Sequence, residues 1–336
     1  MAMRVGINGF GRIGRQTYKA IREYYPDELK VVAVNDITDI ANLAYLLRYD
    51  SIYGAFDGEV EQTDTGLLVD GEEIWVLVER DPANLRWGDL GVDIVIESTG
   101  LFRSSEKARL HLQAGAKKVI IAAPGKGDVL TVVLGVNEDE YDPARHHIVS
   151  GSSHATNCVA VVAKVLHERF GVVRGLITGI QSYTSDQRLV DMPHRDLRRG
   201  RHAALNIVPT ATGVAGGLGS VIPELAGKFD GTALRVPTPA GSIADLSVEL
   251  ARVTTAEEIN YALREAAHNG LEGLLWVSDE PLVSSDVIAA AFSSIVDAPL
   301  TMVVGGTMVK VMAWYDAEWS YSARMADLAA LMARLL

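Results

Sequence analysis

Three glycines near the beginning of the sequence, Gly9, Gly11 and Gly14, have the spacing Gly-x-Gly-x-x-Gly. In a turn between a strand and a helix, such glycines let backbone N–H groups approach a pyrophosphate at the amino end of the helix. Asp36 follows about 20 residues later, where an acid binds a ribose 2′-hydroxyl and repels a 2′-phosphate. We therefore predict an NAD site. The alternative is a glycine turn followed by a helix-capping aspartate.

The first half of the chain provides the strand and the helix that this motif requires. Residues 4–8 form a short apolar run directly before the glycines, and residues 11–24 have the apolar spacing of a helix. Further patterns predict strands at residues 30–35, 91–98 and 118–122 and a helix at residues 105–114. This alternation of strands and helices predicts a doubly wound parallel sheet of the Rossmann type.

The second half of the chain has a different pattern. Residues 155–170 have the spacing of a long helix, and residues 324–336 that of a terminal amphipathic helix. Several runs that alternate apolar and polar residues predict strands at residues 173–181, 232–236, 243–250 and 301–314. We expect an α+β domain with a mostly antiparallel sheet. The polar, arginine-rich residues 184–204 predict a long loop, and such loops are usually functional.

Composition limits the class of protein. The 336 residues suffice for two domains, and the net charge of −12 disfavours nucleic acids and anionic membranes as partners. The single cysteine, Cys158, cannot form a disulfide within the chain, which is typical of a cytoplasmic protein. No secretory signal pattern precedes the first strand, and no apolar run approaches the ~20 residues of a membrane span. We expect neither secretion nor membrane insertion.

The segment from Ser150 to Cys158 reads Ser-Gly-Ser-Ser-His-Ala-Thr-Asn-Cys. It resembles the catalytic segment of the glyceraldehyde-3-phosphate dehydrogenase family, Ser-x-x-Ser-Cys-Thr-Thr-Asn-Cys. Runs along essentially the whole chain resemble the same family, at residues 4–15, 49–51, 79–82, 97–100, 183–199, 209–213, 235–239, 283–286 and 314–316. The resemblance implies a Rossmann NAD-binding domain at residues 1–150 with 317–336 and a catalytic domain at residues 151–316. It also implies an NAD-dependent oxidoreductase, a small phosphorylated substrate and a homotetramer.

The resemblance further implies two anion sites and a set of cofactor contacts. Matched motifs assign Thr184, Asp186 and Arg235 to the substrate phosphate, and Ser153, Arg199, Thr212 and Gly213 to a second, inorganic phosphate. Arginine forks and hydroxyls suit phosphate oxygens, although a solvated, salt-bridged loop is the alternative for the loop arginines. The implied cofactor residues are Asn8, Gly9, Phe10, Gly11, Arg12, Ile13, Gly14, Asn35, Asp36, Arg80, Ser98, Thr99, Gly100, Ala122, Ala317 and Tyr321.

Four residues differ from the family's motifs at positions that carry its catalytic or binding groups. His154 stands in place of the nucleophilic cysteine, and an imidazole cannot form a thiohemiacetal. Gln181 stands in place of the histidine base, and an amide does not titrate near neutrality. Ala155 lacks a phosphate-binding hydroxyl, and Ala317 replaces the asparagine that orients the nicotinamide carboxamide. We predict negligible phosphorylating oxidation of glyceraldehyde 3-phosphate.

His154 is the candidate for altered chemistry. With an ordinary pKa near ~6.5, its imidazole would transfer protons at neutral pH during direct hydride transfer. Gln181 would hydrogen-bond the same substrate oxygen. The alternative is that His154 only fills the space of the cysteine. Cys158 follows one helical turn later and is expected to be a small core residue. No histidine spacing predicts a metal site.

Three functions are compatible with these residues. The first is an NAD-dependent oxidoreductase that acts on a small phosphorylated carbonyl compound or alcohol without a thioester. The second is a catalytically silent NAD-binding homologue with a regulatory or scaffold role. The third is a non-redox isomerase or lyase that reuses the phosphate sites, with His154 as base. Only the first predicts a change in reduced nicotinamide with a phosphorylated substrate.

Overall fold

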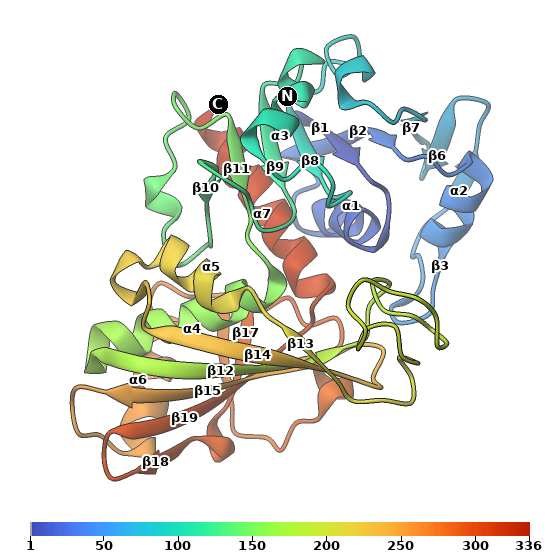
Figure 1. Ribbon diagram of the computed structural model, residues 1–336. Coiled ribbons are helices and arrows are strands. Elements are labelled where there is room, and N and C mark those ends of the chain that lie inside the picture. Colours follow the sequence, from blue (N-terminus) through green and yellow to red (C-terminus); the bar gives the residue numbers. More distant parts are fainter. Residues whose placement is uncertain (1) are drawn as a thin grey trace. The chain divides into compact units, whose positions relative to one another are not determined.

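The computed structural model describes residues 2–336, which divide into two compact units (Figure 1). The first unit comprises the chain up to Val132, Asp139–Ser152 and Tyr321–Leu336. The second unit comprises Val133–Glu138 and Ser153–Ser320. We keep residues 1–150 with 317–336 and residues 151–316 as the proposed domains.

The first unit is built on a nine-stranded sheet. Its strand order is β10 (Leu130–Thr131), β11 (Ile148–Ser150), β9 (Lys118–Ile121), β8 (Ile94–Glu97), β1 (Met3–Asn8), β2 (Leu29–Asn35), β7 (Glu72–Leu77), β6 (Gly66–Val69) and β5 (Val60–Gln62). All neighbours from β10 to β7 are parallel, which confirms the predicted Rossmann sheet. The antiparallel edge formed by β5 and β6 is an addition that the sequence patterns did not predict.

Four helices accompany this sheet: α1 (Arg12–Tyr24), α2 (Ile40–Arg48), α3 (Ser105–Gln113) and α7 (Trp319–Leu335). A small hairpin of β3 (Tyr49–Asp50) and β4 (Gly54–Ala55) follows α2. α1 buries Gly14, Tyr18 and Ile21, which lie on one face because their spacing matches the helical repeat. α2 and α3 begin at the side-chain caps Asp39 and Ser104. The predicted helices at residues 11–24 and 105–114 are confirmed.

The second unit is built on a mostly antiparallel eight-stranded sheet, as predicted. Its strand order is β13 (Val208–Ala211), β14 (Phe229–Val236), β12 (Val172–Ser182), β15 (Ser242–Leu250), β19 (Met308–Tyr315), β17 (Ser294–Asp297) and β16 (Leu275–Ser278), and β18 (Met302–Val304) also pairs with β19. Only the pairs β12–β14 and β16–β17 are parallel among the described strands of this sheet.

The helices of the second unit are α4 (His154–Phe170), α5 (Val214–Val221) and α6 (Ala256–His268). α4 buries Cys158, Val162 and Leu166 in one apolar core with Leu246 of β15 and Val311 of β19. Such a core fixes the position of the helix relative to the strands, because a packed interior leaves few voids. The amino end of α4 is thereby held in place for chemistry.

Two predicted elements differ from the structure. The terminal helix predicted for residues 324–336 begins earlier, at Trp319, where Asp316 Oδ1 accepts hydrogen bonds from the N–H groups of Glu318 and Trp319. The single strand predicted for residues 301–314 is a hairpin of β18 and β19. Gly305-Gly306 forms its turn, and both residues have positive φ angles, 61° and 76°.

The loop predicted for residues 184–204 contains no helix or strand, which confirms that prediction. Backbone hydrogen bonds fold it back on itself. The Arg188 N–H donates to the Arg199 carbonyl at 3.0 Å, and the Met192 N–H donates to the Gly200 carbonyl at 2.9 Å. These bonds give the loop a defined shape despite its irregular backbone.

Candidate active site

Strand register gathers several polar side chains at one end of the second unit's sheet. Gln181, near the end of β12, is paired with Arg235 of the parallel strand β14. Ser242, at the start of β15, is paired with Tyr315 at the end of β19, and its hydroxyl accepts a hydrogen bond from the Ser182 N–H. An amide, a guanidinium group and a phenol therefore meet at this sheet edge.

His154 is the first residue of α4. Ser153 caps the helix, and its hydroxyl accepts a hydrogen bond from the Thr156 N–H at 3.1 Å. The imidazole is half-buried and stacks against Tyr315, with ring centroids 5.9 Å apart and an interplanar angle of 27°. The helix start and the end of β19 thus determine where the imidazole lies.

The surroundings of His154 lower its pKa to about 4. Loss of water around the ring is the largest cause, and the positive charge of Arg235 acts in the same direction. Asp186 acts in the opposite direction without offsetting them. The expectation of an ordinary histidine pKa is therefore wrong. At neutral pH this imidazole is uncharged, so it offers one N–H donor rather than a positive charge.

Gln181 is buried, and its amide Nε2 donates a hydrogen bond to the Tyr315 hydroxyl at 3.2 Å. Burial is the largest cause of a raised pKa for Tyr315, which therefore remains a neutral phenol. His154 and Gln181 contact the same tyrosine. The two positions predicted to be catalytic are thus brought together through Tyr315.

Arg235 has a partly satisfied guanidinium group. Its Nη1 donates to the Ser182 carbonyl at 2.9 Å, whereas its buried Nε has no hydrogen-bond acceptor among residues 2–336. Burial is the largest cause of a lowered pKa for Arg235, although Asp186 raises it. A buried donor without an acceptor is destabilising by about 1–3 kcal/mol, so an anion bound here would remove that penalty.

The two sets of residues assigned to phosphates are not separate in the structure. Arg199, assigned to one phosphate, forms an ion pair with Asp186, assigned to the other. Nε and Nη2 of Arg199 also donate to the Thr210 hydroxyl at 2.9 and 2.7 Å. Burial raises the pKa of Asp186, but the Thr184 hydrogen bond and the charges of Arg235 and Arg199 lower it overall. Asp186 is thus a carboxylate that neutralises one of the two arginines.

The other residues assigned to the inorganic phosphate lie at the starts of two helices. Ser153 Oγ is 2.9 Å from Thr156 Oγ1 at the start of α4. Gly213 precedes α5 without a side-chain cap, and Thr212 Oγ1 accepts a backbone hydrogen bond there at 3.3 Å. α5 packs closely on α4, since a Cβ at Gly217 would lie 2.6 Å from Thr156 Oγ1. The amino ends of helices favour anions.

Cys158 lies one turn into α4 and is fully buried. Its Sγ is 3.6 Å from Ser294 Oγ and 3.8 Å from the Ala313 carbonyl oxygen. Burial raises the pKa of this thiol to about 12. The prediction that Cys158 is a core residue is confirmed, and a thiol with such a pKa does not supply a thiolate nucleophile at neutral pH.

The glycine motif in the first unit has the geometry that a dinucleotide requires. Gly9 has a φ angle of 90°, which forms the tight turn after β1. A Cβ at Gly14 would lie 2.1 Å from the Gly9 carbonyl oxygen, so only glycine allows α1 to approach so closely. A Cβ at Gly11 would meet no atom within 4 Å, which leaves its backbone accessible to a pyrophosphate. These three positions fit an NAD pyrophosphate.

Asp36, directly after β2, stabilises the same turn. Its Oδ2 accepts a hydrogen bond from the Phe10 N–H at 2.8 Å, and its Oδ1 accepts one from the Thr38 N–H at 3.1 Å. A carboxylate has about four acceptor positions, so two remain for a ribose diol. Asp36 therefore fits the role of the acid that recognises an unphosphorylated ribose.

The remaining cofactor positions assigned from the sequence have varied surroundings. Arg12 forms an ion pair with Asp50 at 2.6 Å, and Arg80 is exposed. Tyr321 is buried, and its hydroxyl donates to the Ser152 carbonyl at 2.8 Å. Ala317 belongs to the second unit. The other assigned positions lie at or just beyond the carboxyl ends of first-unit strands or in the first turn of α1: Asn8, Ile13, Asn35, Ser98, Thr99, Gly100 and Ala122.

Comparison with known proteins agrees with this geometry. A family model described as the NAD binding domain of glyceraldehyde 3-phosphate dehydrogenase matches residues 3–105, and one described as the C-terminal domain matches residues 153–317. Glyceraldehyde-3-phosphate dehydrogenase of Geobacillus stearothermophilus is 56% identical over 333 residues, covering 99% of each chain. That of Thermotoga maritima is 55% identical over 332 residues, with the same coverage. The chain belongs to the glyceraldehyde-3-phosphate dehydrogenase family.

Membership of the glyceraldehyde-3-phosphate dehydrogenase family makes the chain an NAD-binding dehydrogenase of this type. Its first unit carries the NAD-binding fold, and its second unit corresponds to the family's C-terminal domain. None of the α-helices in residues 2–336 has both the length and the apolar character needed to span a membrane.

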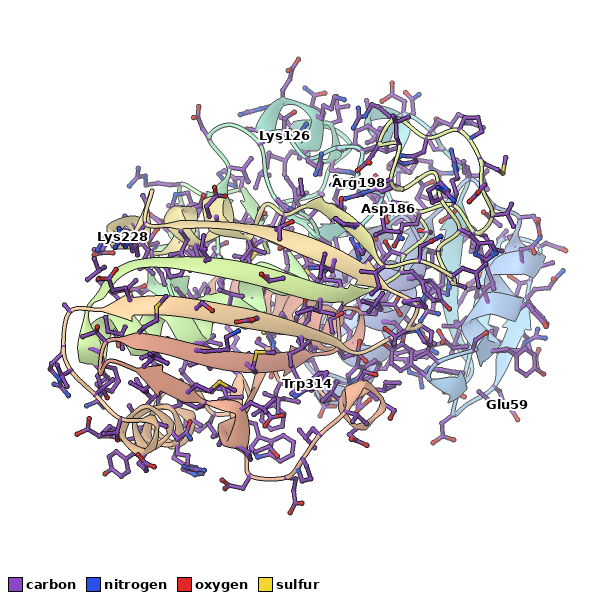
Figure 2. The ribbon with its side chains drawn as sticks, turned by 60° about the horizontal axis from the view of Figure 1, so that its bottom comes forward. Glu59, Lys126, Asp186, Arg198, Lys228 and Trp314 are labelled. Carbon is purple, nitrogen blue, oxygen red and sulfur yellow. The ribbon has the colours of Figure 1, made fainter. Side chains whose placement is uncertain are left out.

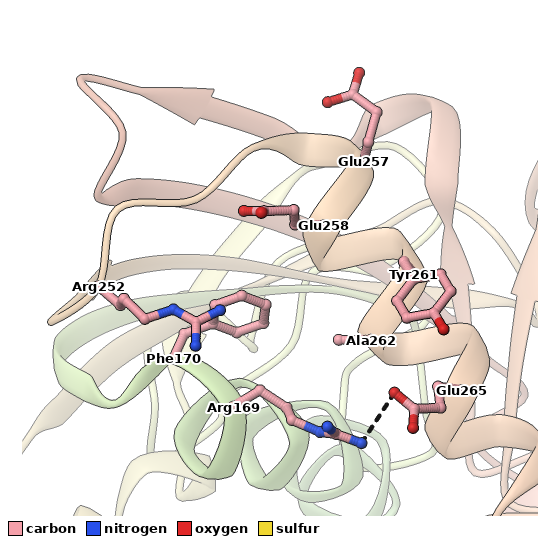
Figure 3. Close-up of a pocket in the computed structure, with 8 residues that line it drawn as sticks. All are labelled: Arg169, Phe170, Arg252, Glu257, Glu258, Tyr261, Ala262 and Glu265. Atoms are coloured by element: carbon pink, nitrogen blue, oxygen red, sulfur yellow. Dashed lines mark ion pairs between the residues drawn. The ribbon is translucent and has the colours of Figure 1, made fainter.

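A cavity of about 540 Å³ lies at the carboxyl end of α4, away from His154 along that helix (Figure 3). Arg169 at the end of α4 forms an ion pair with Glu265 of α6 at 3.0 Å, and Arg252 lies over the Phe170 ring. No residue assigned to the dehydrogenase chemistry lines it. We therefore do not count this cavity as part of the candidate active site.

Tyr315 is the site residue to which the sequence analysis gave no role. Alternation along β19 buries Val309, Val311, Ala313 and Tyr315 on one face, so the pattern marks Tyr315 as part of the core. Its hydroxyl, however, also receives the Gln181 hydrogen bond. The sequence did contain a signal for this role. Tyr315 is the last of the buried residues of β19, and a buried hydroxyl needs a polar partner.

Proposed function

We propose that this protein is an NAD-dependent oxidoreductase that acts on a small phosphorylated carbonyl compound or alcohol without a covalent thioester. Ordinary phosphorylating oxidation of glyceraldehyde 3-phosphate is negligible. The observation that carries this proposal is the neutral imidazole of His154 at the first position of α4, while the one thiol of the chain is buried. In this proposal His154 replaces the reactive group, and Arg199 and Arg235 bind the substrate.

His154 acts as a hydrogen-bond donor to the substrate oxygen in this proposal. An uncharged imidazole at a helix amino end polarises a carbonyl and stabilises negative charge that develops on its oxygen. Its low pKa makes it a weak base, so stabilising that charge, rather than removing a proton, is its main contribution. NAD, when bound, supplies the hydride chemistry. Tyr315 stacks against the ring, and Gln181 holds the Tyr315 hydroxyl in place.

Arg235 supports the choice of a phosphorylated substrate. Its buried Nε lacks an acceptor, whereas Arg199 is already paired with Asp186. A phosphate oxygen would satisfy the Nε donor, and a guanidinium group binds phosphate through directed hydrogen bonds. Thr184 and Asp186 complete the proposed substrate site, because Thr184 donates to Asp186 and Asp186 orients Arg199.

We also propose a cytoplasmic homotetramer. Leu189 and Leu197 in loop 184–204 are exposed, as is Leu176 of β12. The strand register puts Leu176 on the same face of the second unit's sheet as Trp314, which Figure 2 labels. Leu176 lines a shallow cavity on this face together with Met308. Exposed apolar side chains such as Leu176 and Met308, which line one cavity, are typical of subunit interfaces. The acidic charge of the chain argues against nucleic acid as a partner.

The isomerase or lyase alternative is less well supported. A neutral histidine that polarises a carbonyl also occurs in proton-transfer enzymes, but these need a carboxylate base beside it. Asp186 is the carboxylate that acts on the charge of His154, and it is engaged by Arg199 and Thr184. We therefore retain one main alternative, a catalytically silent NAD-binding homologue with a regulatory or scaffold role.

The test is an NADH absorbance assay with a panel of phosphorylated aldehydes, ketones and alcohols and their unphosphorylated analogues. The proposal predicts turnover with at least one phosphorylated compound and its loss in His154→Ala, while NAD affinity is unchanged. Tight NAD binding with no turnover on the whole panel would support the silent homologue instead. Normal phosphorylating turnover of glyceraldehyde 3-phosphate would overturn the proposal.

A further inference from the structure

A chain of buried polar side chains joins α3 to the ends of the central strands in the first unit. The side chains of His111 in α3 and Glu97 in β8 have no solvent exposure. His111 Nε2 lies 2.9 Å from Glu97 Oε2, and Trp87 Nε1 lies 3.1 Å from His111 Nδ1. The chemistry proposed for the second unit uses none of these three residues.

Trp87 determines the protonation state of His111. An indole N–H can only donate, so Nδ1 of His111 is the acceptor and carries no proton. The single proton of the neutral ring is therefore on Nε2, where it is donated to Glu97. A charged His111 would have a proton on Nδ1 and would lose the bond from Trp87.

Glu97 is a buried carboxylate held by neutral donors. Its Oε2 accepts hydrogen bonds from His111 and from the Asn8 side-chain amide. Its Oε1 accepts one from the Thr99 N–H at 2.8 Å and another from the Thr99 hydroxyl. Within residues 2–336 no lysine or arginine pairs with it. A buried carboxylate of this kind depends on each of its donors.

The network ends at positions assigned to the cofactor. The Asn35 side-chain amide donates to Asn8 Oδ1 at 2.7 Å. Asn35 is followed by Asp36, which accepts the Phe10 N–H of the glycine turn. Asn8, Asn35 and Thr99 stand at or just beyond the carboxyl ends of β1, β2 and β8, the edge at which doubly wound sheets bind dinucleotides.

We propose that His111 is a positioning residue for the NAD site. Its Nε2–H, fixed by Trp87, orients Glu97, and Glu97 holds Asn8 and Thr99 in the conformation that binds the dinucleotide. The proposal rests on the NAD cofactor of the family and not on the chemistry of His154. It therefore stands or fails independently of the proposed function.

Two amide substitutions separate the two nitrogens of His111. Calorimetric titration with NAD would compare the full-length wild type with His111→Gln and His111→Asn. Gln places an N–H donor near the position of Nε2 and restores the bond to Glu97, whereas Asn keeps an acceptor near Nδ1 for Trp87 but leaves Glu97 short of a donor. We expect NAD affinity close to that of the wild type for H111Q and a loss of about tenfold or more for H111N.

Two results would overturn the proposal. One is equal NAD affinity in the wild type, H111Q and H111N, which would make the network purely structural even if the melting temperatures differ. The other, which needs no variant, is a ¹⁵N-histidine NMR spectrum of the wild-type protein in which Nδ1 of His111 is protonated. We expect a single neutral tautomer with the proton on Nε2.

Discussion

His154 is subject to several influences that disfavour a positive charge on its ring. Packing removes water, Arg235 repels a second cation, and the amino end of α4 carries a partial positive charge. Asp186 opposes them, but its charge is shared with Arg199 and Thr184. The residue type was readable from the sequence, whereas its neutrality follows from neighbours that only the fold brings together.

The lowered pKa of His154 predicts a pH dependence of stability. The folded value is about 4 and the reference value 6.5, so the unfolded chain binds more protons between these values. The contribution is present in full above the reference value and is lost as the pH falls toward the folded value. Over this pH range, the unfolding free energy of the wild type should fall by up to about 3 kcal/mol more than that of His154→Asn.

Urea unfolding of both proteins, followed by circular dichroism from about pH 7 to about pH 4.5, measures this difference. The unfolding free energy of the wild type should fall more steeply on acidification than that of H154N. Parallel pH profiles for the two proteins would show that His154 titrates normally in the folded state.

Restoring the family's residues at two positions should restore sulfur chemistry. A cysteine at the first position of α4 is favoured as a thiolate by the helix end, and a histidine at position 181 would serve as its base. We expect His154→Cys with Gln181→His to raise phosphorylating oxidation of glyceraldehyde 3-phosphate by ~10³-fold or more. The matched control, His154→Ser with Gln181→His, should remain inactive in the same NADH assay. Equal rates in both double variants would contradict this account.

At the scale of elements, the register of the second sheet places the site. β12, β14, β15 and β19 were expected as strands, but only their pairing shows that Gln181 lies beside Arg235 and that Ser242 lies beside Tyr315. Alternation within one strand reports its buried face and not its neighbour in space. The composition of the site was therefore predictable in part, and its arrangement was not.

Local signals predicted part of the first unit. The patterns for α1, β1, β2, β8 and β9 lie within short stretches of sequence and were confirmed, whereas α2 and the parallel strands β7, β10 and β11 were not predicted. The His111–Glu97 contact joins residues on two elements and was not foreseen. Neither was the ion pair of Arg199 with Asp186, since long-range pairs leave no periodic signal in one sequence.

At the scale of the whole molecule, the chain has the fold of the glyceraldehyde-3-phosphate dehydrogenase family. In our proposal, the residues that change its reaction are His154 and Gln181. The glycine turn has the geometry that an NAD pyrophosphate requires, and Arg199 and Arg235 are present in the second unit. Because these binding features accompany a histidine at the first position of α4, we propose changed chemistry rather than a loss of all function.

The proposed tetramer makes a further prediction at this scale. Light scattering coupled to gel filtration should give the mass of a tetramer for the wild type. Leu176→Lys places a charge on the open sheet face and should shift the mass toward smaller species, because a buried unpaired charge destabilises an interface. Tyr261→Lys alters a similarly exposed residue on α6 and serves as the control. A tetramer in both variants, or a monomeric wild type, would contradict this prediction.

Intact-protein mass spectrometry after acid quenching tests the central claim most directly. The protein would be incubated with NAD and glyceraldehyde 3-phosphate in the absence of inorganic phosphate, so that any acyl-enzyme accumulates. The account predicts an unchanged mass, because the chain's one thiol, Cys158, is buried with a pKa raised to about 12. An added acyl group that peptide mapping locates on Cys158 would contradict it.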